Sequence, residues 1–413
     1  MNENEKPIVS VTRNKDISKA VHDALDVINI PNLSGKTVLL KPNVGRQVDP
    51  KLGINTNPEV VTAIYYYLRD RYKAKYLIGD SPIINTDTYK AFEQSGYNDL
   101  IRDDNLQFID LDELTPVKIE IPTGKILKSI RLTGYWHDID YIISIPVLKM
   151  HMHCGASLSF KNIKGLIYKR DKINLHHFQA PDVIKELKKN IRKIKELDIA
   201  IADLGKVISP DLAIIDASYA HEGMGPSSGN AVKLDTIIAS TNFLAADIIA
   251  LTLSQPEWSL EDVPHLKLIS EAISPSIKSP DNIKTIPENI NKFVKSLEPP
   301  PKSITIKYKN VNLIDIDSCS ACLSTIFNLL KNNKEFIDKY YTSEKPLNLA
   351  IGKGIKKSDL YSDTYLIGNC TSHQKENGTF IQGCTPVESK ILKTIKEKLA
   401  LNHKLSDSST RRY

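Results

Sequence analysis

A short run of the sequence, SIPVLKMHMHCGASLSFKNIKG (residues 144–165), places many chemically active side chains directly after an apolar stretch. It is rich in residue types that bind anions, ligate metals or transfer protons. These residues are Lys149, His151, His153, Cys154, Lys161, Asn162 and Lys164. The run predicts a functional site if the fold brings matching residues to the same place.

Three other apolar segments also lead into polar loops that contain glycine or proline. The polar residues at these points are Lys41, Asn43, Asp80, Asp216, His221 and Glu222. In open parallel sheets, ligands bind at the carboxyl ends of the strands. Because four segments share this pattern, we predict a single cleft at that edge of a sheet.

The charges in this predicted cleft indicate an anionic ligand, because lysine and asparagine side chains bind carboxylate and phosphate groups. The residues predicted to bind a small anionic substrate are Lys41, Asn43, Asp80, Lys149, Lys161 and Asn162. Proton transfer needs a group that titrates near neutrality. The candidates for that role are His151, Glu222 and Asp216. The chain contains neither a P-loop motif nor a dinucleotide fingerprint after a strand.

The H-x-H pair of His151 and His153 has three interpretations. The two rings could supply two ligands of a metal site. His151 could instead contact the substrate or transfer a proton, or both histidines could simply be hydrogen-bonded within a loop. Cys154 is interpreted as a small buried residue, with a metal ligand or a nucleophile as the alternative.

Four of the five cysteines lie in the last quarter of the chain and predict a metal centre. Cys319 and Cys322 form a C-x-x-C pair, while Cys370 and Cys384 stand at the ends of predicted elements. Four thiolates can hold a [4Fe-4S] cluster or a zinc ion. We favour the cluster because the second pair is widely split, whereas zinc ribbons have two tight pairs. A redox-active dithiol with two unrelated cysteines is a third interpretation.

Apolar β-rich runs alternate with helical patterns through the first two-thirds of the chain, which predicts an α/β fold with a largely parallel sheet. The predicted strands are 7–13, 37–41, 74–80, 106–111, 140–148, 211–217 and 235–241, and the predicted helices are 16–29, 58–72, 86–95, 181–203 and 242–254. In a smaller second domain we predict strands at 311–316, 347–352 and 364–368 and helices at 321–331 and 386–400. Residues 184–197 show the apolar spacing of an amphipathic helix, whose lysines form a solvated face.

The predicted domain organisation follows from one break in this pattern. SLEPPPKS contains three consecutive prolines and is typical of a linker. We predict an α/β domain with the cleft over 1–297, a linker over 298–303, a small cluster-binding domain over 304–405, and a disordered tail over 406–413.

Composition is that of a globular protein, with 41% hydrophobic residues, 25% charged residues and a net charge of +6 among 413 residues. The N-terminal segment lacks the apolar core of a signal peptide, and no segment has eighteen uninterrupted apolar residues. We expect a soluble cytoplasmic protein that binds neither nucleic acid nor membrane. A reducing compartment also favours a metal site over disulfides.

Several of these motifs occur together in a known family. LLKPNVG, TNPEVV, IGDSP, IPVLKMH, SFKNIKG and DASYAHEGMGPSSG resemble the successive blocks of the domain of unknown function 362 (DUF362) family, over about residues 7 to 255. The C-terminal cysteines resemble the iron–sulfur region that members often carry, although Cys384-Thr385-Pro386 replaces the Cys-Pro-Pro of many relatives. The resemblance implies an α/β fold and a cluster, but no settled reaction.

A second resemblance concerns the order strand, His, Gly-rich turn, Lys and Gly. It is similar to the pattern of the nickel-pincer lactate racemase group and would give His151, Gly155, Lys161 and Gly165 the corresponding places. This resemblance implies that His151 and Lys161 line a pocket.

The leading functional prediction is an iron–sulfur enzyme acting on a small anionic substrate. A cluster held by four cysteines favours redox chemistry over a lyase reaction. A protein electron donor would then supply electrons to the cluster. The alternatives are an electron carrier or maturation factor without its own substrate, and a zinc-stapled binding protein. The sequence leaves a homodimer open.

Overall fold

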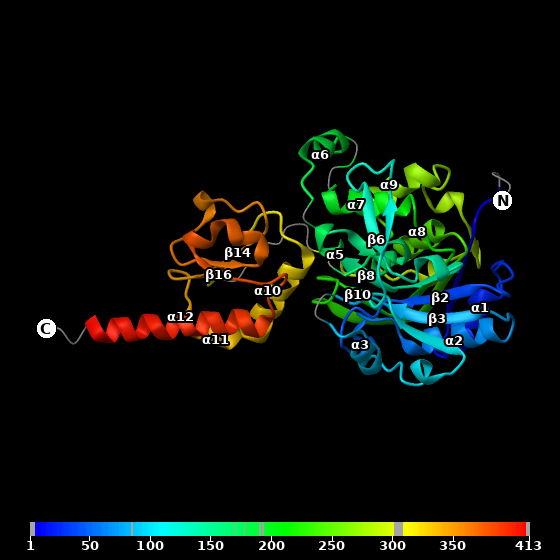
Figure 1. The fold of residues 1–413 in the computed structure, drawn as a ribbon, viewed down its shortest axis with the longest axis horizontal. Helices are drawn as coiled ribbons and strands as arrows, with labels where there is room; N and C mark the ends of the chain where they lie inside the picture. Colours follow the sequence, from blue (N-terminus) through cyan, green and yellow to red (C-terminus); the bar gives the residue numbers. More distant parts are fainter. Residues whose placement is uncertain are drawn as a thin grey trace. The chain divides into compact units, whose positions relative to one another are not determined.

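The computed structural model describes residues 5–83, 86–169, 171–176, 178–189, 191, 194–300 and 309–409 (Figure 1). The chain divides into two compact units, Met1–Pro300 and Pro301–Tyr413. Part of the expected linker, residues 301–303, lies outside the described residues. No helix among the described residues is long and apolar enough to cross a membrane.

The first unit is built on a large sheet in which most neighbouring strands are parallel, and this confirms the predicted α/β class. The strands follow the order β12-β1-β11-β10-β7-β2-β3-β4, while β8 pairs with β10 and β9. A separate two-stranded sheet pairs β5 with β6. The bounds are β1 Ile8–Arg13, β2 Thr37–Pro42, β3 Lys75–Asp80, β4 Leu106–Asp110, β5 Val117–Glu120, β6 Ser129–Leu132, β7 Tyr141–Ile145, β8 Val147–His151, β9 Gly155–Ser157, β10 Leu212–Glu222, β11 Asn230–Ser240 and β12 Lys284–Ile286.

Helices cover both faces of this sheet, with α1 and α2 on one side and α7, α8 and α9 on the other (Figure 1). Their bounds are α1 Ile17–Leu25, α2 Pro58–Arg69, α3 Thr88–Gln94, α4 Ser159–Asn162, α5 Asp171–Asn174, α6 Pro181–Leu187, α7 Glu196–Gly205, α8 Phe243–Ser254 and α9 Pro264–Ile273. Asn57 caps α2 as its position before Pro58 suggests, because its side chain accepts the backbone N–H of Glu59.

The two covered faces explain why the strands read as continuous apolar runs. Successive side chains of a strand point to opposite faces. In β2, Val38 and Leu40 therefore join the core under α1 and α2, whereas Leu39 joins the core under the other helices. Both positions must be apolar, as expected for a parallel sheet buried on both sides.

The predicted strand 140–148 is in fact two strands, β7 and β8, separated at Pro146, whose carbonyl accepts the N–H of Asp216. β8 continues to His151, and β10 continues past the predicted end to Glu222. Lys149 and His151 therefore lie in a strand rather than in a loop. The prediction was wrong here because polar residues that face a buried site break the apolar pattern of a strand.

The predicted amphipathic helix across 184–197 is also wrong. α6 ends at Leu187 and α7 begins at Glu196. The apolar spacing nevertheless indicated burial correctly, because Ile191 and Ile194 are buried against α7 and α9 residues. Ile191 and Ile194 are thus buried from non-helical positions.

The second unit contains a four-stranded parallel sheet in the order β13-β14-β15-β16. The elements are β13 Val311–Asp315, α10 Ser320–Asn332, α11 Lys334–Tyr340, β14 Leu347–Ile351, β15 Tyr365–Ile367, β16 Thr379–Ile381 and α12 Glu388–Ser409. Helix α12 extends to Ser409, four residues into the predicted tail 406–413, while residues 410–413 lie outside the described part. The sequence analysis missed α11 and β16.

Candidate functional site

Two adjacent strands of the large sheet end in a buried ion pair. Lys41 lies at the end of β2 and Asp80 at the end of β3, with 2.7 Å between Lys41 Nζ and Asp80 Oδ1. Their side chains are 0% and 3% exposed. Asp80 also accepts the backbone N–H groups of Val44 and Ser81. The pair therefore fixes the loops that follow both strands.

Asn162 joins this pair from the segment that follows β9. Its amide nitrogen donates to the Lys41 carbonyl and to Ser144 Oγ, both at 3.1 Å, and its oxygen lies 3.3 Å from Lys41 Nζ. Three residues that the sequence predicted to bind substrate, Lys41, Asp80 and Asn162, thus share one hydrogen-bonded network. All three are buried.

A carboxylate that the sequence analysis missed holds the short helix α4, which carries Asn162. Asp247 of α8 accepts the N–H groups of Ser159 and Phe160 and the Ser159 hydroxyl, at 2.8, 3.0 and 2.5 Å. Burial raises the pKa of Asp247 to about 7. The available signal was an aspartate standing alone in the apolar helix FLAADIIALTL.

Lys149 lies on β8 and points to the same region. Its ammonium donates to the Ile54 carbonyl at 2.8 Å and to Asn43 Oδ1. Burial, followed by the charges of Lys161 and Arg46, lowers the pKa of Lys149 to about 7. Asn43 therefore contacts Lys149, as expected for two members of one site.

We refer to Lys41, Arg46, Lys149 and Lys161 as the cationic cluster, because the other three all act electrostatically on Lys149. Lys41 is balanced by Asp80. Among the described residues, Arg46, Lys149 and Lys161 form no ion pair with a carboxylate. Burial lowers the pKa of both Arg46 and Lys161, which marks the energetic cost of these uncompensated charges.

His151 stands beside the cationic cluster as a neutral ring. Burial, followed by the charge of Lys161, holds its pKa well below the usual range. Its Nδ1 accepts the backbone N–H groups of His153 and Cys154, at 3.2 and 3.3 Å. The ring proton is therefore assigned to Nε2, which makes His151 a hydrogen-bond donor at that atom.

The other two candidate acid–base groups make different contacts. Asp216 is buried and accepts the N–H groups of Asn57 and Ser218 and the Ser218 hydroxyl. Glu222 accepts the backbone N–H of Glu298. Within the described part of the chain, neither carboxylate forms a hydrogen bond or ion pair with the cationic cluster, and both hold neighbouring segments through backbone N–H groups.

Gly165 gives a direct test of how tightly this region is packed. A Cβ at this position would lie 2.2 Å from Asp80 Oδ1 and 2.5 Å from Lys41 Nζ. We expect Gly165→Ala to lower the free energy of unfolding by about 1–3 kcal/mol in urea denaturation. Gly45→Ala is the control, because the nearest atom to a Cβ there lies 3.9 Å away. Equal stability of the two variants would contradict the packing described here.

A hollow of about 470 Å³ lies elsewhere on the first unit. Its lining includes Lys15, Asp49, Glu59, Lys233 and Asp235, and no member of the cationic cluster. These side chains mix both charges, as an ordinary solvated surface does. We therefore place the candidate site at the cationic cluster, where Lys41 and Lys149 are buried and cations outnumber the one carboxylate, that of Asp80.

The second unit brings its cysteines to one edge of its sheet. Cys319, Cys370 and Cys384 each follow the carboxyl end of a parallel strand, β13, β15 and β16 respectively, within three or four residues. The segments before Cys370 and Cys384 are joined by two hydrogen bonds between Asn369 and Gly383, at 2.8 and 2.9 Å. The topology thus sets these loops side by side.

Cys319 and Cys322 interact directly at the start of α10. The hydrogen bond from Cys322, with the backbone N–H groups of Cys322 and Ala321, lowers the pKa of Cys319 to about 6. Thr385 donates its hydroxyl to Cys322 Sγ at 3.2 Å. Gly368 has φ +94°, and a Cβ there would lie 3.1 Å from the same sulfur. The thiols therefore sit against small and polar groups rather than in an apolar core.

The four thiols are linked by electrostatic interactions, because Cys319 acts on Cys370 and Cys384, and Cys370 acts on Cys322 and Cys384. No three of the four sulfurs lie within 4.8 Å of one another. A tetrahedral zinc ion with Zn–S bonds of about 2.3 Å would need separations of about 3.8 Å. The arrangement is more open than a zinc site, and convergence on one metal centre remains a prediction.

The fold and these motifs agree with a family match. Residues 38–252, slightly more than half of the chain, match the family described as domain of unknown function (DUF362). The chain therefore belongs to the DUF362 family, which confirms the resemblance seen in its motifs. The match ends before the cysteine-bearing second unit.

One curated relative and two solved structures are similar to this chain. The thylakoid-associated protein sll1697 of Synechocystis sp. is 29% identical over 227 residues, which cover 54% of this chain and 64% of that protein. The match thus spans less than two-thirds of the relative's length.

The first structure is the lactate racemase apoprotein from Thermoanaerobacterium thermosaccharolyticum, with TM-score 0.38, 15% identity, and coverage of 59% of this chain and 56% of that chain. The second is a Thermotoga maritima protein from a structural genomics consortium, with TM-score 0.37, 14% identity, and coverage of 58% and 60%. At this level of similarity neither structure indicates an activity for this chain.

Proposed function

We propose that this chain is an iron–sulfur enzyme that binds a small anionic substrate at the cationic cluster and carries out redox chemistry on it. One observation carries the substrate class. Arg46, Lys149 and Lys161 form no ion pair among the described residues, although burial disfavours their charges. A bound anion would offset that cost, because opposite charges attract strongly in a partly desolvated site.

The residues of the first unit have distinct tasks in this proposal. Lys149 and Lys161 hold the anionic group, while Asn43 orients Lys149 through their hydrogen bond. Lys41 and Asp80 keep the surrounding loops in place. His151 donates a hydrogen bond from Nε2 to the substrate, since its Nδ1 is occupied by backbone N–H groups.

The residues that would hold a [4Fe-4S] cluster are Cys319, Cys322, Cys370 and Cys384. Their fit is supported by the helix N-terminus at Cys319, by the close approach of Gly368 to Cys322, and by sulfur separations wider than zinc requires. When bound, such a cluster supplies one-electron transfer. A protein electron donor is part of this proposal, and we place the reaction in the cytoplasm.

An electron carrier without its own substrate would need the same cysteines, but it would not need uncompensated cations in the other unit. We therefore rank it second. A zinc-stapled binding protein ranks third.

The proposal is tested on the full chain, purified without oxygen. We expect iron and acid-labile sulfide in nearly equal amounts, with a broad visible absorption. We also expect sulfate, added as a probe for the cationic cluster, to raise the melting temperature in proportion to the logarithm of its concentration. Iron with no anion effect would favour the electron carrier. Zinc without iron or sulfide would contradict the proposed cluster.

Lys149 predicts how anion binding depends on pH. Its pKa is lowered to about 7 by burial and by Lys161 and Arg46, with smaller effects of Asp80 and Lys41. Only the protonated ammonium attracts an anion, so sulfate affinity should be constant below pH 7 and fall by up to about tenfold per unit above it. Calorimetric titration from pH 6 to 9 measures this.

The matched control is Lys149→Gln, which should bind sulfate more weakly and with a flatter pH profile. His151 and His221 stay neutral across this range because their pKa values are lowered below it. Identical pH profiles in the wild type and the variant would show that Lys149 does not bind the anion.

A further inference from the structure

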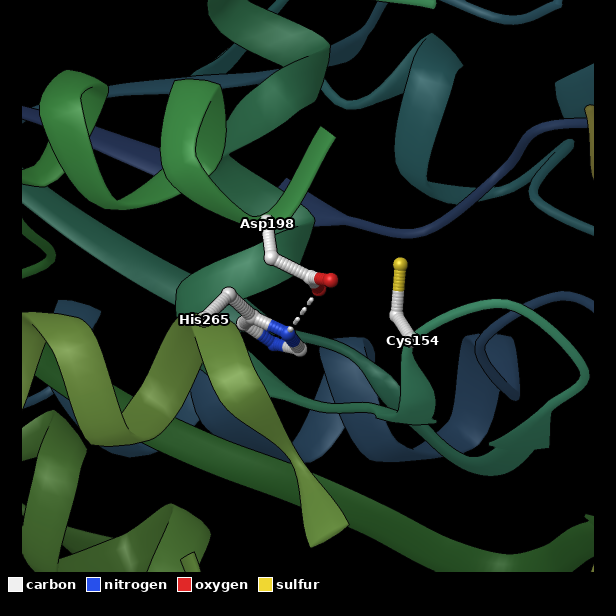
Figure 2. Close-up of side chains that lie close together, drawn as sticks. All are labelled: Cys154, Asp198 and His265. Carbon is white, nitrogen blue, oxygen red and sulfur yellow. Dashed lines mark ion pairs between the residues drawn. The ribbon is translucent and has the colours of Figure 1, made fainter. Parts of the chain in front are cut away.

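Three buried side chains outside the proposed substrate contacts converge on one point in the first unit. Cys154, Asp198 and His265 each offer a ligand atom, and these atoms all lie within 4.8 Å of one another (Figure 2). His265 Nδ1 is 3.5 Å from Asp198 Oδ1. The three side chains are at most 1% exposed.

The residues come from three separate segments that the fold brings together. Asp198 lies in α7, His265 lies in α9, and Cys154 lies in the turn between β8 and β9. Gly155 brings this turn against the backbone just before α9: its φ is +74°, and a Cβ would lie 2.4 Å from the Asp262 carbonyl oxygen. The His265 ring stacks on Phe160. Backbone packing therefore brings the three side chains together, and their proximity does not depend on the conformation of one flexible side chain.

The polar atoms at this point lack hydrogen-bond partners. Among the described residues, Asp198 Oδ1 and both ring nitrogens of His265 are buried without a hydrogen bond. The 3.5 Å approach of His265 to Asp198 is thus not an aligned hydrogen bond. Unsatisfied buried groups of this kind are rare, and each costs about 1–3 kcal/mol. One ring nitrogen of His265 and a carboxylate oxygen of Asp198 lie within 4.8 Å of each other and of Cys154 Sγ, and this convergence of unsatisfied groups indicates a missing ligand.

We propose that Cys154, Asp198 and His265 bind a divalent transition metal of the zinc class. Thiolate, imidazole and carboxylate are all zinc ligands, and a set with sulfur and nitrogen disfavours magnesium and calcium. One thiolate and one carboxylate balance the charge of a divalent ion, so the loaded site is neutral and suited to burial. Binding displaces the Cys154 thiol proton.

A nucleophilic triad uses the same residue types but needs a different arrangement. Its base must be hydrogen-bonded to the orienting acid, whereas His265 and Asp198 are not so aligned. Lys161 belongs to the cationic cluster and also lies near the proposed metal site. Its charge lowers the pKa of His265, and the charges of Cys154 and Asp198 act on Lys161 in turn. Three protein ligands leave the fourth tetrahedral position open, as in catalytic zinc sites.

The test uses Co²⁺ as a spectroscopic probe on the full chain in which Cys319, Cys322, Cys370 and Cys384 are all replaced by alanine, which removes the competing thiolates of the second unit. We expect one Co²⁺ per chain, with a thiolate-to-cobalt charge-transfer band. Adding Cys154→Ala should abolish this band. His265→Gln should weaken Co²⁺ binding by at least about 100-fold. Losing a residue that only hydrogen-bonds a metal ligand already lowers metal affinity by about 10- to 100-fold, and losing a ligand itself should lower it further.

Circular dichroism and urea denaturation verify that each variant is folded, and Cys154→Ser provides a second substitution of similar size. Failure of the folded parent to bind Co²⁺, or an unchanged band in the Cys154→Ala variant, would overturn the proposal. Both results are independent of iron content, so the test is separate from that of the proposed cluster.

Discussion

Replacing Cys370 with alanine is expected to remove most of the iron and the brown colour from the protein. The Cys370 thiol lies in electrostatic range of Cys319 and follows β15 at the cysteine-bearing edge of the small sheet. Alanine offers no thiolate, and a cluster that loses one of four protein ligands becomes exposed and labile. Iron and sulfide per chain, measured without oxygen, should fall several-fold.

Cys154→Ala is the matched control for this variant. Cys154 is buried in the other unit, and burial raises the pKa of its thiol to about 12. Iron and sulfide content should therefore match the wild type, although Co²⁺ binding at the site with Asp198 and His265 should be lost. Equal iron loss in the two variants would mean that the cluster ligands are assigned wrongly.

The sequence predicted the parts of the fold that depend on local pattern. Continuous apolar runs mark strands covered on both faces, and the residues that end them, Lys41 and Asp80, meet because neighbouring parallel strands end at one edge. The same reasoning brought Lys149, Asn43 and Asn162 to that region. Polar residues directly after apolar runs thus indicated side chains that the fold brings together.

What the sequence did not reveal depends on tertiary packing. Asp198 and His265 occupy unremarkable helical positions, and only the packing of α7 on α9 and the close approach of Gly155 bring them to Cys154. The end of α6 at Leu187 was missed because the apolar spacing beyond it reports burial and not backbone conformation. Such contacts between distant segments leave no local periodicity.

Replacing Lys41 with methionine is expected to lower the free energy of unfolding by about 3–5 kcal/mol. Methionine retains most of the length and apolar contacts of the side chain but removes the ammonium, so Asp80 stays buried without its partner. Asp80 keeps two backbone N–H donors, from Val44 and Ser81, which places the expected loss toward the lower end of that range. Urea denaturation of the two proteins measures the difference.

The matched control is Lys19→Met, which breaks an ion pair with Asp23 at 3.3 Å whose side chains are 60% and 47% exposed. Because solvent screens such a pair, this change should cost less than about 1 kcal/mol. Adding Asp80→Asn to Lys41→Met should recover part of the loss, since the buried charge is then removed. If Lys41→Met were no more harmful than Lys19→Met, the Lys41–Asp80 pair would not be the element that holds the loops around the cationic cluster.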